Sequence, residues 1–246
     1  PYLDIEYREE LEEAEVPCWL NLRTDSLYVL RWGDPDYTRE FLANVPRDLM
    51  RFEAGFYMGP DGYVRGRDFT YKDPELSGQL ELHKHAYRFM MFGRLAYDLT
   101  LTRDFFEEWL KHRFPHADPT LLYDTWQSAS RLIPRVNRFF FRVNDFQFSP
   151  EGCMWRDGFL TVDAFFRHGP LPGSGILSVQ EYARAVLADK PFDGITPMEV
   201  AENLDADARE TLEGVRRLRA RTDSGQKELR STLLDMEAMA YLGRYY

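Results

Sequence analysis

The stretch Val16-Pro17-Cys18-Trp19-Leu20-Asn21-Leu22 is a short apolar run, which is typical of a buried strand. A second apolar run, Phe52 to Met58, ends at the turn-forming sequence Gly59-Pro60-Asp61-Gly62. Between the two runs, Asp34 and Pro35 are residue types that cap and begin a helix. A strand, a helix and a strand in this order are the repeat of a parallel α/β fold.

From Leu76 onward the apolar residues recur at helical spacing, which predicts a long helix through Asp98. Capping residues and helix-stopping prolines divide the rest of the chain into further helices. These are expected from Thr102 to Phe114, from Asp118 onward, from Ser178 to Asp189, from Thr196 onward and from Gln226 to Tyr246.

The composition excludes several classes of partner. The 246 residues include 31 Lys and Arg against 41 Asp and Glu, for a net charge of −10. Nucleic acid and anionic lipid both require a concentrated basic surface, so we expect neither as a partner. The aromatic share of 15% is high, and aromatic faces are commonly offered to sugars and other ring-shaped ligands.

The sequence predicts neither a metal site nor a bound cofactor. Only two cysteines occur, and no dinucleotide or phosphate-binding glycine motif is present. His83 and His85 would point to different faces of a helix, while Pro115 breaks the helix that would align His112 with His116.

Localisation is weakly determined by the sequence. The first fifteen residues are acidic and lack the apolar core of a signal peptide, and no apolar run is long enough to span a membrane. The chain begins at Pro1 and its final helix ends at Tyr245-Tyr246 without a glycine cap, so we expect a piece of a larger protein. A bacterial periplasmic or extracellular location is slightly favoured over the cytoplasm.

The end of the second predicted strand carries one candidate site. Asp61 follows the strand directly, and Tyr63, Arg65 and Arg67 come just after it. Side chains at the carboxyl end of a parallel strand point into the crevice where α/β enzymes keep their sites. Arginine binds carboxylates bidentately, so this segment suits a uronate group or sugar hydroxyls. The alternative is a turn in which Asp61 only caps the backbone.

Asn21, Arg23 and Asp25 occupy the same position at the end of the first predicted strand. Asp25 and Asp61 together would supply the two carboxylates that glycoside hydrolysis uses. The alternative is that these are loop residues and a helix cap.

Arg31 and Trp32 place a guanidinium group beside an indole ring shortly before the predicted helix. This pair is either a platform for a sugar or packing over the start of the helix. The aromatic segment from Phe139 to Trp155 likewise either lines a ligand groove or fills a gap between helices.

The segment from Phe52 to Phe114 resembles the α-glucuronidases of glycoside hydrolase family 67. The resemblance is carried by Phe92-Gly93-Arg94-Leu95-Ala96-Tyr97-Asp98, preceded by Gly55, Gly59 and Asp61 and followed by Glu108-Trp109. In that family the motif lies on the helix after the last barrel strand, where a C-terminal helical domain begins. The family's catalytic carboxylates lie on earlier strands and are not carried over to this chain.

We therefore expect the C-terminal fragment of a (β/α)8 TIM barrel, in residues 1–75, followed by a mostly α-helical domain in residues 76–246. The expected function is part of a glycoside hydrolase that acts on a carbohydrate, an acidic or a plant or algal polysaccharide, with Asp25 and Asp61 as catalytic residues. Substrate would be bound by Asn21, Arg23, Arg31, Trp32, Tyr63, Arg65 and Arg67. The fragment alone is expected to be inactive. The alternative is a non-enzymatic helical protein-interaction module, and a homodimer through the helical domain stays open.

Overall fold

The computed structural model describes residues 18–23, 30–44, 53–59, 81–139, 154–155, 158–159, 161–167, 169–171, 173–222 and 225–246. The strands are β1 (Cys18–Arg23), β2 (Glu53–Gly59), β3 (Met154–Trp155) and β4 (Gly158–Phe159). The helices are α2 (Pro35–Ala43), α4 (Glu81–Lys84), α5 (Ala86–Tyr97), α6 (Arg103–Arg113), α7 (Pro119–Phe139), α8 (Val162–Arg167), α9 (Val179–Leu187), α10 (Pro197–Arg219) and α11 (Lys227–Tyr245).

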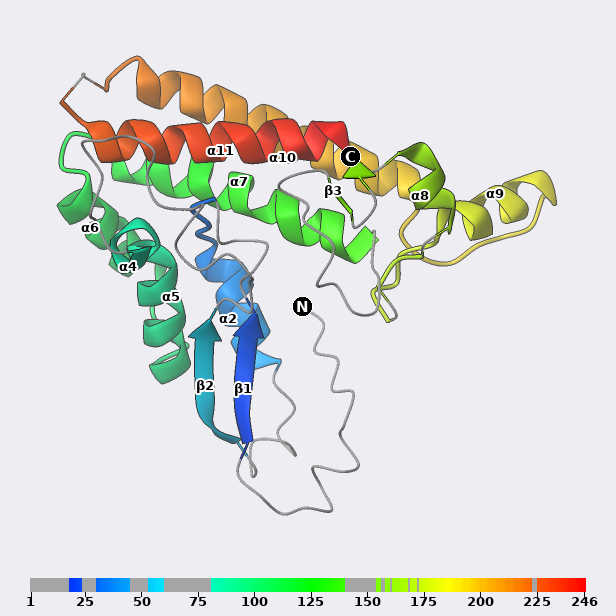
Figure 1. The fold of residues 1–246 in the computed structure, drawn as a ribbon, viewed down its shortest axis with the longest axis horizontal. Coiled ribbons are helices and arrows are strands. Elements are labelled where there is room, and N and C mark those ends of the chain that lie inside the picture. The colour runs from blue at the N-terminus through cyan, green and yellow to red at the C-terminus, as the bar shows by residue number, and fades with distance from the viewer. Residues whose placement is uncertain are drawn as a thin grey trace.

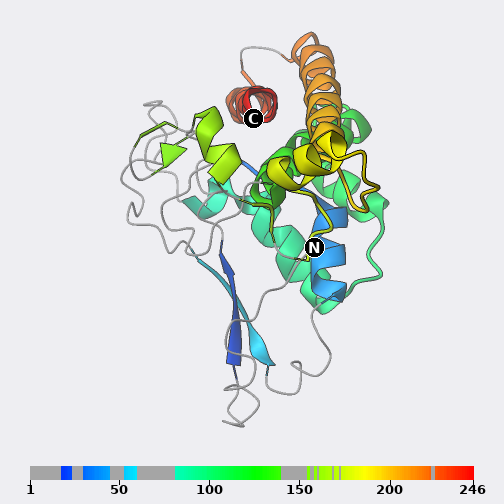
Figure 2. The same cartoon turned by 90° about the vertical axis from the view of Figure 1, so that its right-hand side faces the viewer.

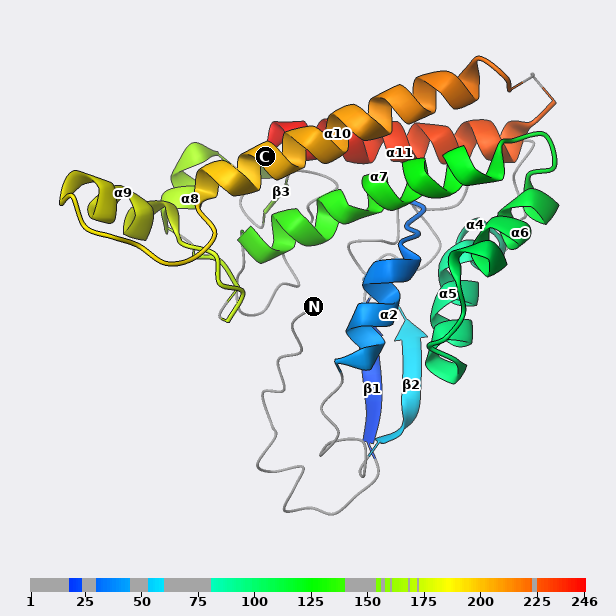
Figure 3. The same cartoon turned by 180° about the vertical axis from the view of Figure 1, so that it is seen from behind.

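Three long helices, α7, α10 and α11, pack against one another along their lengths and form the helical layer (Figures 1 and 3). Each helix turns an apolar stripe inward, as the helical spacing in the sequence predicts. The stripes consist of Leu122, Trp126, Ala129, Ile133 and Val136 on α7, Val200, Leu204, Ala208, Val215 and Leu218 on α10, and Leu229, Leu233, Met236, Met239 and Ala240 on α11. Most of the described core lies in this layer.

The strands β1 and β2 are parallel neighbours in a two-stranded sheet. Their register pairs Cys18 with Glu53 at one end and Arg23 with Gly59 at the other, so both carboxyl ends lie at the same edge. The arrowheads of both strands point toward the helical layer (Figure 1), and the pair extends away from one side of that layer (Figure 2). The predicted strand-helix-strand unit is therefore present as β1, α2 and β2.

The prediction of a TIM-barrel fragment is wrong. A (β/α)8 barrel closes eight parallel strands on themselves, whereas the described residues are predominantly helical and contain a single parallel pair of strands. The other pairing, between β3 and β4, is a short antiparallel hairpin. One β-α-β unit does not specify a barrel, because its apolar strands can also pack beside a helical core.

The division of the chain into two domains, residues 1–75 and 76–246, stays a prediction.

Helix starts follow the capping chemistry of the sequence closely. Asp34 accepts a hydrogen bond from the backbone N–H of Tyr37 at 2.9 Å, and Pro35 is the first residue of α2. Ser178 with Glu181, and Thr196 with Glu199, form reciprocal capping boxes at the starts of α9 and α10. These three predicted helix starts are confirmed.

The predicted helix from Leu76 to Asp98 is described only from Glu81 onward, where a turn at His85 divides it into α4 and α5. Phe92 and Leu95 of the motif face the core, and Gly93, Arg94, Ala96 and Tyr97 are exposed. Asp98 ends α5 by accepting hydrogen bonds from the backbone and side chain of Thr100. In the described structure the motif packs and terminates a helix.

Within the described ranges, no helix has both the length and the apolar character needed to cross a lipid bilayer.

We predict opposite effects for two Gly→Ala substitutions. A Cβ at Gly214 of α10 would lie 2.1 Å from Oγ1 and 2.8 Å from Cγ2 of Thr125 on α7, so Gly214→Ala should lower the unfolding free energy by about 1–3 kcal/mol. A Cβ at the exposed Gly93 meets no atom within 4 Å, so Gly93→Ala should raise it by about 0.5–1 kcal/mol. Urea unfolding followed by circular dichroism measures both.

The variant Thr125→Ala in the Gly214→Ala background removes the clashing atoms and should recover most of the lost stability. If Gly214→Ala stabilises the protein as Gly93→Ala does, α7 and α10 do not approach each other as closely as described.

Candidate functional site

The carboxyl edge of the β1–β2 pair is where the sequence places the paired carboxylates. Asn21 pairs with Tyr57 and Arg23 with Gly59 in the register, so the two strands end side by side. This is the arrangement in which residues after neighbouring parallel strands gather at one edge. Five of the predicted site residues lie outside the described residues, namely Asp25, Asp61, Tyr63, Arg65 and Arg67. For Asn21 and Arg23 the description covers the backbone in β1.

Arg31 lies in the core and contacts α11. Its side chain is 2% exposed, and its Nη1 donates to Oδ2 of Asp235 at 2.6 Å and to the Ser231 hydroxyl at 3.2 Å. The backbone N–H of Arg31 also donates to Asp235 Oδ2, at 3.1 Å. This guanidinium group holds a carboxylate of the protein and is not open to a substrate in this structure.

Trp32 is also buried, with 1% of its surface exposed. Its indole Nε1 donates to the carbonyl oxygen of Ser130 on α7 at 2.6 Å, and its ring meets Tyr37 of α2 edge-on with centroids 5.5 Å apart. Of the two interpretations that the sequence left open, packing over the start of the helix describes the observed position.

The N-terminus of α2 brings together polar side chains, of which the sequence predicted only Asp34, as a helix cap. Gln127 of α7 donates from Nε2 to Oδ2 of Asp36 at 2.6 Å, and Arg39 donates to the other oxygen of Asp36 at 2.7 Å. Asp34 is buried beside them, and Arg131 is close enough to influence both aspartates. Gln127 lies outside the apolar stripe of α7, so the helical spacing provides no signal for it.

The two aspartates have opposite pKa shifts. Burial raises the pKa of Asp34 from 3.8 to about 6, although the backbone of Tyr37 and the charge of Arg131 oppose this. Burial also acts on Asp36, but hydrogen bonds from Gln127 and Arg39 outweigh it and hold the pKa of Asp36 below its usual range. A protonatable and an ionised carboxylate therefore lie two residues apart, a pattern found both at functional sites and in structural networks.

Two tyrosines border this cluster. Burial raises the pKa of Tyr123, and that of the almost fully buried Tyr87 well above 10. The Tyr87 ring stacks on Trp109 at 5.2 Å and lies 4.7 Å from Trp126, and its hydroxyl has no hydrogen-bond partner among the described residues. Both hydroxyls stay protonated at any physiological pH.

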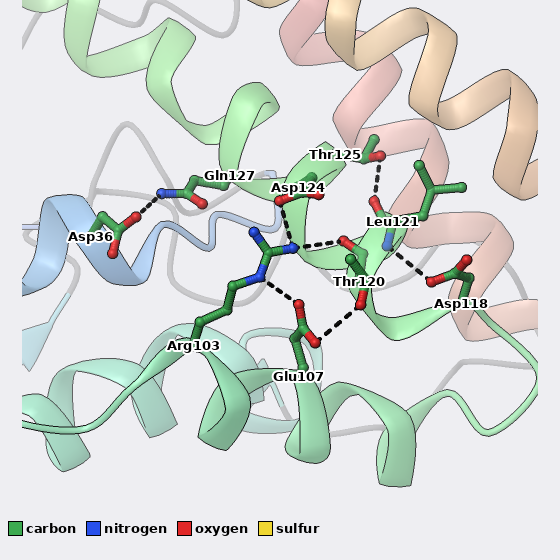
Figure 4. A network of polar contacts seen from close by, with 9 residues as sticks. All are labelled: Asp36, Arg103, Glu107, Asp118, Thr120, Leu121, Asp124, Thr125 and Gln127. Carbon is green, nitrogen blue, oxygen red and sulfur yellow. Dashed lines mark hydrogen bonds and ion pairs between the residues drawn. The ribbon is translucent and has the colours of Figure 1, made fainter.

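A second polar network joins α6 to α7 on the surface (Figure 4). Arg103 lies at its centre, with Nε 2.5 Å from Oε1 of Glu107 and Nη2 2.8 Å from Oδ1 of Asp124. The same guanidinium group lies 4.6 Å from the centre of the Tyr123 ring. Glu107 also accepts a hydrogen bond from Thr120 at 3.1 Å, so both carboxylates are used in joining the two helices.

The described residues contain no group of three or more His, Cys, Asp or Glu side chains that could hold a metal ion. His83 is exposed whereas His85 is buried, so the two side chains lie in different environments, as their spacing predicts.

No family model matches the sequence, and no curated protein sequence matches it. Its fold, however, is similar to that of a glycoside hydrolase. One similar structure is a GH138 enzyme targeting pectin rhamnogalacturonan II, with a TM-score of 0.71 and 13% sequence identity. The match covers 98% of this chain but only 30% of that chain. The likeness supports a glycoside-hydrolase-like fold and does not support the narrower resemblance to family 67 α-glucuronidases.

The shifted pKa of Asp34 predicts a pH-dependent stability. Its folded pKa, about 6, exceeds its reference value of 3.8, so the folded state binds the proton more tightly and the contribution to stability is lost as the pH rises through 6. Asn is an equally good helix cap but carries no charge. As the pH rises from 5 to 7.5, the unfolding free energy of Asp34→Asn minus that of wild type should therefore increase by about 1.4 kcal/mol.

Asp36→Asn is the matched control, since it neutralises a carboxylate of the same cluster whose pKa is lowered. Its stability difference from wild type should stay constant over the same pH range and change only in stronger acid. Urea unfolding at several pH values measures both variants, and a constant difference for Asp34→Asn would contradict the raised pKa.

Proposed function

We propose that this chain forms part of a glycoside hydrolase that cleaves a glycosidic bond in a pectin-type polysaccharide. The observation that carries the proposal is the likeness to a GH138 enzyme targeting pectin rhamnogalacturonan II, which extends over 98% of the chain. The acidic composition and the high aromatic content agree with a sugar ligand rather than a nucleic acid or an anionic membrane.

The proposed catalytic residues are Asp25 and Asp61, one acting as general acid and the other as base or nucleophile. The parallel register supports this pairing, because β1 ends at Arg23 and β2 ends at Gly59, each two residues before its aspartate. Arg23, Arg65 and Arg67 would orient hydroxyl or carboxylate groups of the substrate, and Tyr63 would stack on a sugar ring.

The isolated chain is proposed to be inactive. It spans 30% of the similar enzyme, so groups from elsewhere in a longer protein would be needed to complete the substrate cleft. Activity of an α-glucuronidase type is not part of the proposal, since the motif from Phe92 to Asp98 packs and ends α5.

The test is hydrolysis of rhamnogalacturonan II oligosaccharides by the full-length natural protein that contains this chain, with released reducing ends separated by chromatography. We expect activity in the full-length protein and none in residues 1–246 alone. Asp25→Asn and Asp61→Asn should each lower kcat by at least about a hundredfold, because each removes a group that transfers a proton or bonds to the sugar.

Asp193→Asn is the control, because Asp193 is an exposed loop residue ahead of α10. An inactive full-length protein would contradict the proposed reaction. Unchanged activity in the Asp25 and Asp61 variants would contradict their assignment, and hydrolysis by residues 1–246 alone would contradict the need for a longer protein.

A second candidate function is protein interaction, and α9 is the observation that favours it. This helix lies at one end of the molecule (Figure 1) and buries none of its residues. Val179, Tyr182, Val186 and Leu187 recur at the spacing of one apolar helix face. Val186 and Leu187 at its end are 53% and 87% exposed, whereas Val179 and Tyr182 are half-buried. An exposed apolar face of this kind is typical of a contact surface.

If a homodimer forms through this face of the helical domain, Val186→Ser/Leu187→Ser should convert the dimer to a monomer. Sedimentation equilibrium measures the mass, and an unchanged circular dichroism spectrum shows that the fold is kept, as expected for two exposed positions. The control is Arg184→Ser on α9 with Ala188→Ser at the C-cap of the same helix. A wild-type protein that sediments as a monomer would contradict the homodimer.

A further inference from the structure

Three arginines follow one another along a single face of α7. Arg131, Arg135 and Arg138 are separated by four and three residues, so their side chains are neighbours on the helix surface. Arg131 and Arg135 form ion pairs with Asp207 of α10. The charge of Arg131 also lowers the pKa of Asp34 at the start of α2. Figure 3 shows α7 running between α10 and α2. We name these three residues the arginine stripe.

Asp207 is one carboxylate shared by two guanidinium groups. Its Oδ2 lies 2.7 Å from Nε of Arg135, and its Oδ1 lies 3.7 Å from Nη1 of Arg131. Burial raises the pKa of Asp207 even though both arginines act to lower it. Since the two guanidinium groups flank the same carboxylate, they are close to each other, and one positive charge of the pair is left over.

Most of the hydrogen-bond donors of these two arginines are unused. The 3.7 Å separation is too long for a hydrogen bond, so Arg131 makes none within the described parts of the chain. Arg135 engages Asp207 through Nε, and its two Nη groups have no partner there. The two side chains are 39% and 36% exposed, so these donors can reach a ligand from solvent.

Other acidic groups lie near the stripe and offset part of its charge, so the unused donors rather than the net charge mark the site. Asp36 is already bonded to Gln127 and Arg39, and Asp34 is buried with a pKa raised to about 6. The negative charge of Glu210 lies close enough to Asp207 to raise the pKa of Asp207. Arg138 adds a further guanidinium group, whose Nη2 lies 3.5 Å from the carbonyl oxygen of Ser174.

We propose that Arg131 and Arg135 bind the carboxylate of an acidic sugar unit at the surface between α7 and α10. A guanidinium group presents paired donors in a plane, which matches the two oxygens of a carboxylate, and two adjacent groups hold it more firmly than one. The site is formed by α7 and α10 and not by the residues that follow β1 and β2. The choice of a saccharide as the carrier of the carboxylate rests on the proposed function.

The test is calorimetric titration of residues 1–246 with trigalacturonate at low ionic strength, beside the neutral galactotriose and inorganic phosphate. Trigalacturonate should bind more tightly than either of the other two. Arg131→Gln should weaken trigalacturonate binding at least about tenfold, because the charge-assisted hydrogen bonds from Arg131 to the ligand are lost. The contact between Asp207 and Arg135 is retained in this variant. Arg135→Lys keeps the charge beside Asp207 but removes the planar donors, and should also weaken binding severalfold.

Arg217→Gln is the matched control. Arg217 is exposed in the last turn of α10, and its loss changes the net charge by the same amount. Its effect should stay within about twofold, since Arg217 lies ten residues beyond Asp207 along α10, about 15 Å by the helical rise, and would donate no hydrogen bond to the ligand. Equal weakening by Arg131→Gln and Arg217→Gln, or binding of galactotriose or phosphate as tight as that of trigalacturonate, overturns the proposal.

The titration involves no bond cleavage and is therefore independent of the glycosidase test. A failure to bind trigalacturonate overturns the proposed arginine site. It does not affect the proposal that the full-length protein hydrolyses rhamnogalacturonan II. An inactive full-length protein, in turn, does not alter the binding measured with Arg131→Gln.

Discussion

Hydrogen bonds from two tryptophan side chains to backbone carbonyl oxygens hold the β-α-β unit to the helical layer. Trp32 donates its indole N–H to the carbonyl oxygen of Ser130 at 2.6 Å, and Trp126 of α7 donates its own to the carbonyl oxygen of Arg31 at 2.8 Å. The backbone N–H of Gly33 adds a bond to the Ser130 hydroxyl at 2.8 Å. The Arg31 carbonyl and the Gly33 N–H thus find their hydrogen-bond partners on α7, as buried backbone groups require.

This attachment explains the residue types in the segment. A Cβ at Gly33 would lie 2.4 Å from Cδ1 of Tyr87, so the backbone can approach that ring only as glycine. Arg31 brings a positive charge into the same interior, and Asp235 neutralises it through two contacts. Removing one member of such a buried pair leaves the other uncompensated, which makes α11 as important to this segment as α7.

The same packing changes how the polar residues of α2 and α7 behave. A helix cap at the surface is ionised and solvated, but Asp34 caps α2 inside the protein and burial raises its pKa. On the other side of α7, α10 buries Asp207 while Arg131 and Arg135 stay half-exposed. At this place the packing buries a carboxylate and leaves two guanidinium groups partly facing solvent, which accounts for a basic stripe on a protein of net charge −10.

How far the sequence alone predicts this protein depends on the range of the interaction concerned. Asp34 with Pro35, Ser178 with Glu181 and Thr196 with Glu199 mark helix starts correctly, because a cap acts within three or four residues. Apolar spacing likewise identifies the buried faces of the long helices.

The barrel expectation failed because a strand-helix-strand unit is local, whereas the number of strands in a sheet is set by the rest of the chain. The candidate site likewise has a part that local sequence predicts and a part that depends on distant residues. The strand ends that bring Arg23 and Gly59 together follow from the apolar runs, but the burial of Arg31 and Trp32 does not, since their partners Asp235 and Ser130 lie 204 and 98 residues away. The sequence by itself determined the elements and their caps through short-range hydrogen bonds and periodicity. Only the tertiary structure decided which charges and rings are buried, because burial depends on contacts between distant segments.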